Sequence, residues 1–420
     1  MLTLFKQNKK YRMLLMYQFF SGIGGGIFSI FIMLAVHLIY GNPIYTGIAG
    51  FLIAFPRIMS FAVGPIVDRR NKVNIMRITT LLEFLVLALL AFTPLQENLG
   101  VLFMFATILV YNMAALFENP AGTAYLPQIV REDEIMQANS FINIVALVGG
   151  IAVAAVLFIS LGGGNNINFI YGFSAVFLAI AFLFSLFLKN PVKKENVENL
   201  VSPKYMTDLK EGVRFIRHNV LLYITIAAVA MSFFGEIVMV NRPMFVEYYI
   251  GSQGYVALVA MAIIGGIIAS TFVGTSGNKF KLGRFIFILL MLLSVARFIF
   301  AFVLPVSYTG GLVTSIASAA LASSLGIVFE SLNQKIPPEN MVGRVDTIVT
   351  TFRAIFVAIG ALIGGFVGSL VPSVDYIFIF YGVGYFIIGV FMISVPQMRK
   401  LPMMNEIERR KNSVAPRDDL

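Results

Sequence analysis

Long apolar segments alternate with short polar ones along almost the whole chain. Twelve of the apolar segments have about the twenty residues that an α-helix needs to cross the hydrocarbon core of a bilayer. The pattern therefore predicts an all-α membrane protein with twelve transmembrane helices. The predicted spans are 12–40, 44–67, 75–96, 99–126, 140–161, 167–188, 219–246, 253–275, 283–305, 310–334, 342–370 and 375–396.

Lysine and arginine are confined to one set of polar segments. Most of the 31 basic residues lie at the termini, within alternate loops or at the edges of those loops. The exceptions are Arg57, Arg242, Arg297 and Arg353. Because basic loops stay on the cytoplasmic side of a membrane, both termini are expected in the cytoplasm. The basic N-terminus has no small-residue cleavage site after its apolar run, so residues 12–40 are expected to be a retained helix.

Composition supports a membrane protein and excludes several other classes. Hydrophobic residues make up 58% of the chain and charged residues only 12%, against about 25% in soluble proteins. The net charge of +10 faces anionic lipid under this topology, so no nucleic-acid partner is expected. With no cysteine and two histidines, no disulfide, metal site or cofactor is expected.

The only long interior loop, residues 189–218, divides the spans into two groups of six. Its second part, residues 208–217, places Leu209, Val213 and Ile216 at helical spacing, which indicates an amphipathic helix on the membrane surface. The charged tail is expected to be disordered. The predicted parts are a helix bundle over 1–190, a linker with the amphipathic helix over 191–218, a second bundle over 219–396 and the tail over 397–420.

The two groups of spans look like repeats. Residues 64–72 have a degenerate echo at 274–281, the pair Phe117-Glu118 recurs as Phe329-Glu330, and Pro127 is echoed by Pro337, all at an offset of about 210 residues. Parallel repeats around a central cavity are a known transporter architecture. The expected fold is therefore two pseudo-symmetric six-helix bundles.

A dense charge cluster lies between the second and third spans. Gly64 would allow two helices to approach closely, and Asp68 would accept hydrogen bonds from a neighbouring helix start. Arg69 and Lys72 would hold the turn at an anionic membrane surface.

These residues resemble the major facilitator superfamily. The segment 64–72 resembles the motif of its loop between spans 2 and 3. The segments 126–130 (Leu-Pro-Gln-Ile-Val) and 137–140 (Gln-Ala-Asn-Ser) are similar to the branch that includes macrolide-efflux proteins and siderophore exporters. The chain departs from the family at Asn71, where the motif usually has glycine. It also has no proline beside the glycines of span 5.

The resemblance implies a function. Such a protein is a secondary active transporter of a bacterial cell membrane that works by alternating access. Here it implies proton-coupled efflux of hydrophobic or amphipathic small molecules, with protons, substrate and the bilayer as partners and a monomeric state. Gly64, Asp68, Arg69 and Lys72 would then form the inner gate. Export of a siderophore-like metabolite and uptake by a permease remain alternatives.

Several carboxylates lie within predicted spans, where an ionisable group costs about 2.5–3.5 kcal/mol and needs a partner or a function. Glu236 is the first candidate for proton coupling, since Ser232 lies one turn before it on the same face. Glu118 is the second candidate and Glu330 the third, although Glu330 can also reach the membrane surface.

Further polar residues lie on spans 1, 4, 7, 10 and 11, and the family places the first four around its cavity. Small residues on these stripes can also simply allow helices to pack. Arg353, midway along span 11, is a candidate for binding an anionic group or exchanging partners with a carboxylate. The cavity candidates are Gln18, Ser29, Asn112, Ser232, Ser318 and Arg353.

Arg57 and Glu83 lie at similar depths on consecutive spans. A structural ion pair between them and a transport role are both open interpretations.

Other classes of membrane protein find little support. A membrane-embedded enzyme would need a catalytic constellation, and no G-x-S-x-G or Walker A motif is present. ATP-driven transport by this chain alone is excluded on the same ground. A channel would carry repeated selectivity-loop sequences, which do not appear.

Overall fold

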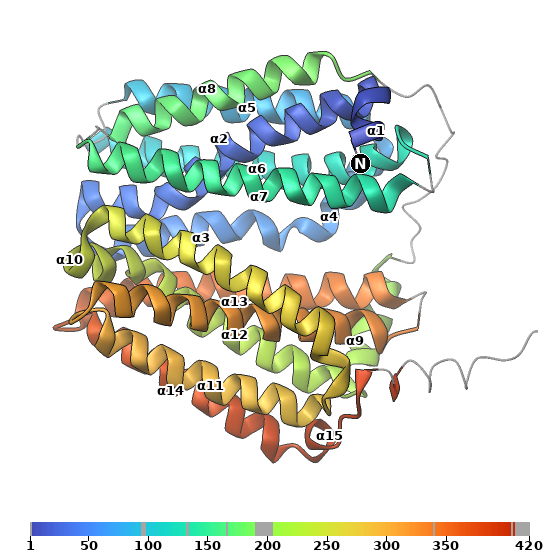
Figure 1. Cartoon of the computed structure of the whole chain (residues 1–420), viewed down its shortest axis with the longest axis vertical. Coiled ribbons are helices and arrows are strands. Elements are labelled where there is room, and N and C mark those ends of the chain that lie inside the picture. The colour runs from blue at the N-terminus through green and yellow to red at the C-terminus, as the bar shows by residue number, and fades with distance from the viewer. Residues whose placement is uncertain are drawn as a thin grey trace, which may run out of the picture. The chain divides into compact units, whose positions relative to one another are not determined.

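The computed structural model describes residues 2–93, 98–131, 134–164, 167–189, 205–338, 341–404 and 406–407. Within these ranges every regular element is a helix (Figure 1). The helices are α1 Leu2–Gln7, α2 Lys9–Tyr40, α3 Pro43–Ile58, α4 Ser60–Arg69, α5 Lys72–Phe92, α6 Asn98–Tyr125, η1 Leu126–Gln128, α7 Ile135–Gly162, α8 Ile167–Leu186, α9 Tyr205–Arg217, α10 Leu221–Ser276, η3 Gly277–Lys279, α11 Leu282–Val303, α12 Tyr308–Lys335, α13 Val342–Leu370, α14 Asp375–Ser394 and α15 Pro396–Arg399.

The twelve predicted spans are confirmed. Among the described residues ten helices are long and apolar enough to cross a membrane. One of them, α10, contains two spans that meet at Gly251, whose φ of 72° lies in the left-handed region that favours glycine. Helices α3 and α4 together supply the remaining span. The all-α membrane fold of twelve spans is thus present.

The second span is broken, which the hydrophobic pattern did not predict. Residues 44–67 were expected to form one helix, but α3 ends at Ile58 and α4 begins at Ser60. Pro56 lies inside the last turn of α3, where a proline removes a backbone donor and clashes with the preceding turn. Met59 joins the two helices with φ −88° and ψ 3°.

The turn between α2 and α3 follows from three successive residues. Gly41 ends α2 with φ 63° and donates its backbone N–H to the carbonyl of His37. The side chain of Asn42 then accepts a hydrogen bond from the backbone N–H of Ile44. Pro43 takes the first helical position, where its missing N–H costs nothing.

The chain divides into two compact units, residues 1–202 and 203–420. In the first unit, α2 and α8 pack closely because Gly24 has no side chain. A Cβ on Gly24 would lie 2.9 Å from the carbonyl oxygen of Ser174. The Ser174 hydroxyl donates to the carbonyl of Gly24 at 2.6 Å. Such close contacts supply the packing energy that the hydrophobic effect does not supply within lipid.

The second unit repeats this mode of packing. A Cβ on Gly360 of α13 would lie 2.7 Å from the carbonyl oxygen of Phe233 on α10. The Ser294 hydroxyl of α11 donates to the carbonyl of Gly382 on α14 at 2.8 Å. Helix α13 therefore meets the backbone of α10 directly, whereas α11 meets α14 through the hydroxyl of Ser294.

Helix α9 belongs to the second unit. A Cβ on Gly212 would lie 2.6 Å from the side chain of Ile348, so α9 rests directly on the start of α13. An ion pair of 2.8 Å joins Glu211 to Arg344 of α13. The helix is amphipathic, with Ile216 buried and Lys210 exposed.

The expected disorder of the tail is wrong for residues 397–404. Helix α15 follows α14 directly, and Met398, Leu401 and Met404 are buried. The backbone N–H of Leu282 donates to the carbonyl of Pro402 at 3.2 Å. The apolar residues, spaced three apart, hold this segment against the start of α11. Residues 408–420 lie outside the described part.

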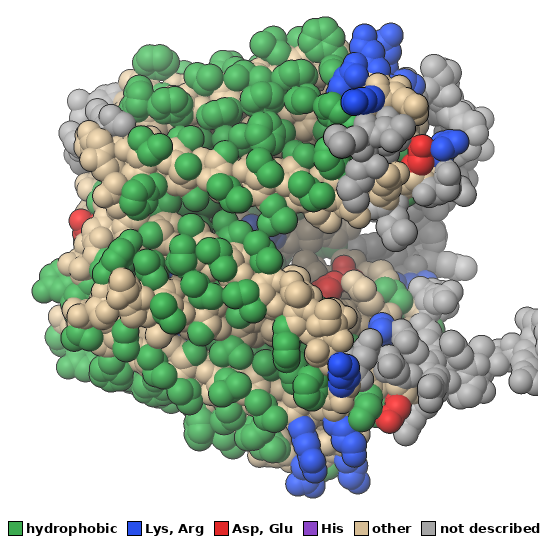
Figure 2. Space-filling view, viewed as in Figure 1, with side chains coloured by type: hydrophobic (Ala, Val, Ile, Leu, Met, Phe, Trp, Pro, Cys, Tyr) green, Lys and Arg blue, Asp and Glu red, His purple; other side chains and the backbone are tan. Residues whose placement is uncertain are grey.

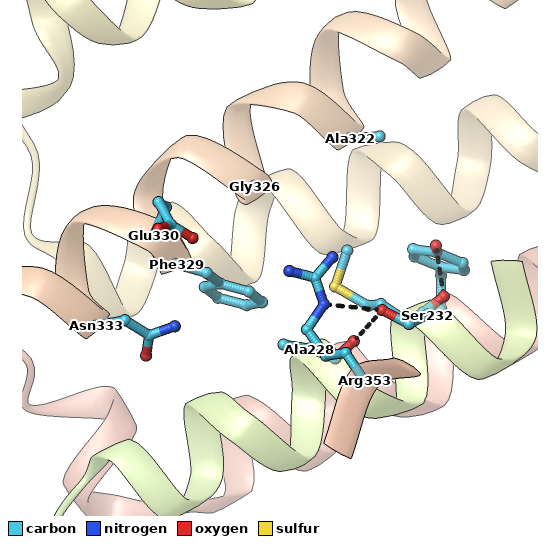
Figure 3. A pocket seen from close by; sticks show the side chains of 10 residues that line it. Ala228, Ser232, Ala322, Gly326, Phe329, Glu330, Asn333 and Arg353 are labelled. Atoms are coloured by element: carbon cyan, nitrogen blue, oxygen red, sulfur yellow. Dashed lines mark hydrogen bonds between the residues drawn. The ribbon is translucent and has the colours of Figure 1, made fainter. Parts of the chain in front are cut away.

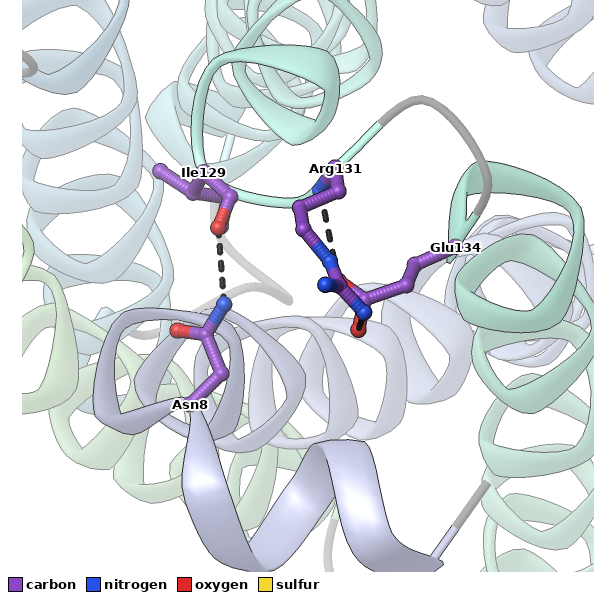
Figure 4. Close-up of polar contacts among 4 residues, drawn as sticks. All are labelled: Asn8, Ile129, Arg131 and Glu134. Atoms are coloured by element: carbon purple, nitrogen blue, oxygen red, sulfur yellow. Dashed lines mark hydrogen bonds and ion pairs between the residues drawn. The ribbon is translucent and has the colours of Figure 1, made fainter.

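Figure 2 shows hydrophobic side chains over the flanks of both units, with lysine and arginine at one end of each unit. We call this end the basic side. In the first unit it is tied together by the N-terminus (Figure 4). The Asn8 side chain caps α2 and donates to the carbonyl of Ile129 at 2.7 Å, and Arg131 pairs with Glu134 at 2.9 Å. This ion pair holds the pKa of Glu134 below its usual value.

Candidate functional site

Two glutamates meet inside the first unit. Glu83 of α5 is only 1% exposed, and its carboxyl group lies in hydrogen-bonding contact with that of Glu118 on α6. Two carboxylates placed this close repel one another, so the arrangement favours a proton shared between them. We call Glu83 and Glu118 the carboxyl pair.

Hydroxyl groups surround the Glu118 end of the carboxyl pair. Tyr17 and Ser21 of α2 both donate to Glu118 Oε1, Ser21 at 2.9 Å. The Tyr17 hydroxyl also lies 2.8 Å from the Thr80 hydroxyl, which donates to the carbonyl of Met76 at 2.7 Å. Two hydroxyl donors therefore converge on one oxygen of Glu118.

The surroundings of Glu83 differ. Its Oε1 atom is buried and has no hydrogen-bond partner. An unpartnered oxygen is tolerated better on a neutral carboxylic acid than on a carboxylate, because burying an unpaired charge costs more. A proton shared by the two groups is therefore favoured on Glu83.

Two more polar side chains, Tyr111 and Gln18, lie between α2 and α6. A Cβ on Gly25 would lie 2.5 Å from the Tyr111 hydroxyl, so this glycine makes room for the tyrosine. Gln18 lies opposite Gly122, and its buried Oε1 atom has no hydrogen-bond partner. Gln18 is thus beside α6, as expected for a residue on the inner face of α2.

Several residues singled out from the sequence lie elsewhere in the first unit. Asn112 donates to the carbonyl of Ile108 in its own helix at 2.8 Å, and Ser29 is exposed. The ion pair expected between Arg57 and Glu83 is wrong: Arg57 is exposed, whereas Glu83 is buried against Glu118.

The residues of the charge cluster are only partly described. Gly64 has open space around its α-carbon, Arg69 is exposed and Lys72 is half-buried. The side chain of Asp68 lies outside the described part. The inner-gate role of these four residues stays a prediction.

The second unit contains a cavity of about 240 Å³ between α10, α12 and α13 (Figure 3). The Arg353 Nε atom donates to Ser232 Oγ at 3.1 Å, and Ser232 donates to the carbonyl of Ala228 at 2.8 Å. This leaves the remaining guanidinium nitrogens of Arg353 facing the cavity. Arg353 and Ser232, two of the predicted residues, are thus brought together.

The wall that α12 contributes is both acidic and aromatic. Glu330 is exposed on the cavity, and Gln334 donates to its Oε1 atom at 3.2 Å. Asn333 is 4% exposed, and its Oδ1 atom has no hydrogen-bond partner. Phe329 lies between the acidic group and Arg353 in Figure 3. A cation, a carboxylate and an aromatic ring therefore share one small space.

The two other predicted residues of this unit do not line the cavity. Glu236 is half-buried on α10, and its Cβ atom lies 3.4 Å from where a Cβ on Gly360 would be, so its stem packs against α13. Ser318 is 1% exposed, and its Oγ atom has no hydrogen-bond partner.

Residues important to the carboxyl pair were missed in the sequence. Tyr17 and Ser21 are four residues apart and Thr80 and Glu83 three apart, so each pair shares one helix face. Helical spacing of hydroxyl and carboxyl groups on two spans was the available signal.

The comparisons with known proteins identify the class of protein. The family model of the Major Facilitator Superfamily matches residues 14–360. The chain belongs to this superfamily of membrane transporters. No curated protein matches it in sequence.

Solved transporters share the fold at low identity. A mutant of the nucleoside transporter NupG has a TM-score of 0.78 at 12% identity, covering 92% of this chain and 99% of that one. The inward-open xylose transporter XylE from E. coli has a TM-score of 0.68 at 13% identity, covering 95% and 98%. A bacterial homologue of the iron transporter ferroportin has 0.68 at 12%, covering 92% and 98%. At these identities the likeness shows the fold alone.

Proposed function

We propose that this transporter is a proton-coupled exporter of amphipathic small molecules. The carboxyl pair is its proton site, and the cavity beside Arg353 is part of its substrate site. The observation that carries the proposal is the contact between Glu83 and Glu118, because only a bound proton allows the two groups to touch.

The proton acts by allowing the two carboxyl groups of the pair to stay in contact. With a proton on Glu83, three hydrogen bonds converge on Glu118, from Glu83, Tyr17 and Ser21. Loss of the proton leaves two adjacent negative charges, which repel one another and require water. Helices α5 and α6 carry these charges, so deprotonation favours a conformation that opens this region to solvent. The proton therefore binds the closed conformation more tightly than the open one, and such a difference in affinity is what coupling requires.

The substrate class follows from the cavity in the second unit. Arg353 offers free donors to an anionic or carbonyl group, and Glu330 offers a carboxylate to a cationic one. Phe329 and Met231 supply apolar contacts. A molecule with polar groups on an apolar framework fits this combination.

Two further points support the finer parts of the proposal. The segments at 126–130 and 137–140 resemble those of macrolide-efflux proteins, which favours export. One solved protein of this fold is described as a D-xylose-proton symporter, so the fold is compatible with proton coupling. Glu236 is the second candidate for the coupling carboxylate, after the carboxyl pair.

The test is transport in proteoliposomes under an imposed pH gradient, with macrolides, cationic dyes and metallophores as probes. Glu118→Gln mimics the neutral acid and keeps hydrogen-bonding capacity. We expect it to abolish pH-driven accumulation while exchange without a gradient persists. Glu134→Gln is the matched control, because Glu134 pairs with Arg131 outside the spans, and it should remain coupled.

Two results would overturn the assignment. Uphill transport by Glu118→Gln at the wild-type rate would remove the carboxyl pair from coupling. If Glu236→Gln alone loses coupling, the proton site lies in the second unit. If a probe accumulates only when the pH gradient drives uptake, the protein is an importer and the proposed export is wrong.

A further inference from the structure

A second hollow in the second unit is chemically unlike the cavity beside Arg353. It is a groove of about 600 Å³ between α9, α10 and α13, and its walls are almost entirely apolar. Phe233, Phe352 and Phe356 line it, with Ile226 and Val229 between them. Phe352 is 44% exposed and Phe356 is 38% exposed, so the rings stand open rather than packed away. This groove plays no part in the function proposed above.

The length of the groove matches one leaflet of a membrane. On α10 its lining runs from Leu222 to Phe234. Twelve residues of helix rise about 18 Å. Half of a hydrocarbon core is about 15 Å thick. The groove therefore extends from the membrane surface to about the midplane, as one acyl chain does.

The mouth of the groove is basic. Arg217, the last residue of α9, lines its end and is exposed, and Arg214 and Lys210 are exposed on the same helix. The acidic residue Glu211 is already paired with Arg344 at 2.8 Å. An anionic phospholipid has apolar chains that end at a negatively charged headgroup. An apolar groove that ends at several cationic groups is complementary to such a molecule.

Helix α9 is fixed in this position. The ion pair with Arg344 and the contact of Gly212 with Ile348 both join α9 to α13. Ile216 is buried in the wall of the groove at 5% exposure. The contacts between α9 and α13 therefore hold the basic mouth next to the apolar groove.

We propose that this groove is a binding site for an anionic phospholipid of the leaflet on the basic side. One acyl chain lies along Phe233, Phe352 and Phe356, and the headgroup phosphate meets Arg217. Because α10 and α13 also carry Ser232 and Arg353 of the cavity, a bound lipid would brace two of the helices that line the substrate site.

The test is native mass spectrometry of the full chain with dioleoyl phosphatidylglycerol, and with dioleoyl phosphatidylcholine as the lipid of equal chain length. We expect at least one phosphatidylglycerol molecule to be retained in preference to phosphatidylcholine. Arg217→Gln should weaken its retention about five-fold, as expected for the loss of one basic group near an anionic headgroup. Ala230→Phe, which fills the groove, should weaken retention of both lipids.

Arg284→Gln is the matched control. Arg284 is exposed at the start of α11, away from the groove, and this variant should retain the lipid as the wild type does. Arg217 is exposed, so its variant is expected to fold even if Ala230→Phe does not. Equal retention of the two lipids by the wild type would overturn the proposal, as would an unchanged preference in Arg217→Gln. Displacement of the lipid by a cationic dye or macrolide at low concentration would assign the groove to the transported molecule instead.

Discussion

The two units pack their helices in the same way but carry different polar residues in their interiors. Both pack their helices through glycines and serine hydroxyls, as at Gly24 and Ser174 in the first and Gly382 and Ser294 in the second. The polar interior of the first unit is acidic, with the carboxyl pair at its centre. The interior of the second unit instead holds arginines against aromatic rings, with Arg297 4.6 Å from the ring centre of Tyr381. The two units thus share the same kind of helix packing but differ in the polar side chains of their interiors.

The difference separates two tasks. Under the function proposed above, the acidic interior binds and releases the proton. The second unit holds its arginines against rings and hydroxyls, as with Arg242, 5.9 Å from the ring centre of Tyr255, and Arg353 on Ser232. Such cations are stabilised by the face of an aromatic ring or by a hydroxyl oxygen.

The largest expected effect concerns equivalent glycines of spans 5 and 11. A Cβ on Gly149 would lie 3.8 Å from Ile23, an ordinary contact, whereas a Cβ on Gly360 would lie 2.7 Å from a carbonyl oxygen of α10. We expect Gly360→Ala to destabilise the second unit by about 1–3 kcal/mol, as overpacking does. Gly149→Ala should be nearly neutral. Thermal unfolding in detergent measures both, and equal shifts would contradict the difference in packing.

A smaller effect is expected at the cavity of the second unit. Arg353→Gln keeps a donor for Ser232 but loses the charge, so probes with an anionic group should bind about ten-fold more weakly, as for the loss of a hydrogen bond to a charged group. Cationic probes should bind as well as before or better. Equilibrium binding by fluorescence tests this. Equal weakening for both kinds of probe would mean that Arg353 only supports the fold.

The smallest effect is expected around the carboxyl pair. Ser21→Ala removes one of the two hydroxyl donors to Glu118, while Tyr17 remains. We expect pH-driven transport to fall about three-fold, within the range for one hydrogen bond. Ser29→Ala is the control, since Ser29 is exposed further along α2. A loss as large as that of Glu118→Gln would show that Ser21 does more than donate one bond.

Much of the fold could be predicted because apolar length alone defines a span. The break at Met59 could not be, because apolar residues continue through it and only the proline three residues earlier signals it. The packed segment after α14 was hidden by its neighbouring charges, although Met398, Leu401 and Met404 recur every three residues.

The site was harder to predict than the fold. Counting residues gives the depth of a side chain but not the direction in which it leaves the helix. Arg57 and Glu83 therefore looked like partners at one depth, yet Glu83 faces α6 and meets Glu118. Arg353 and Ser232 were both selected for their positions on spans near the cavity, and their contact needed the packing of α10 on α13.

The most direct test asks where the proton lies at neutral pH. Infrared difference spectroscopy of the full chain detects the carbonyl stretch of a protonated carboxylic acid. We expect one such signal from the membrane interior of the first unit, lost in Glu83→Gln. In Glu118→Gln the signal should remain but shift, because Glu83 then donates to an amide. A wild type without a protonated carboxyl signal, or a signal unchanged in both variants, would contradict a proton held by Glu83 and Glu118.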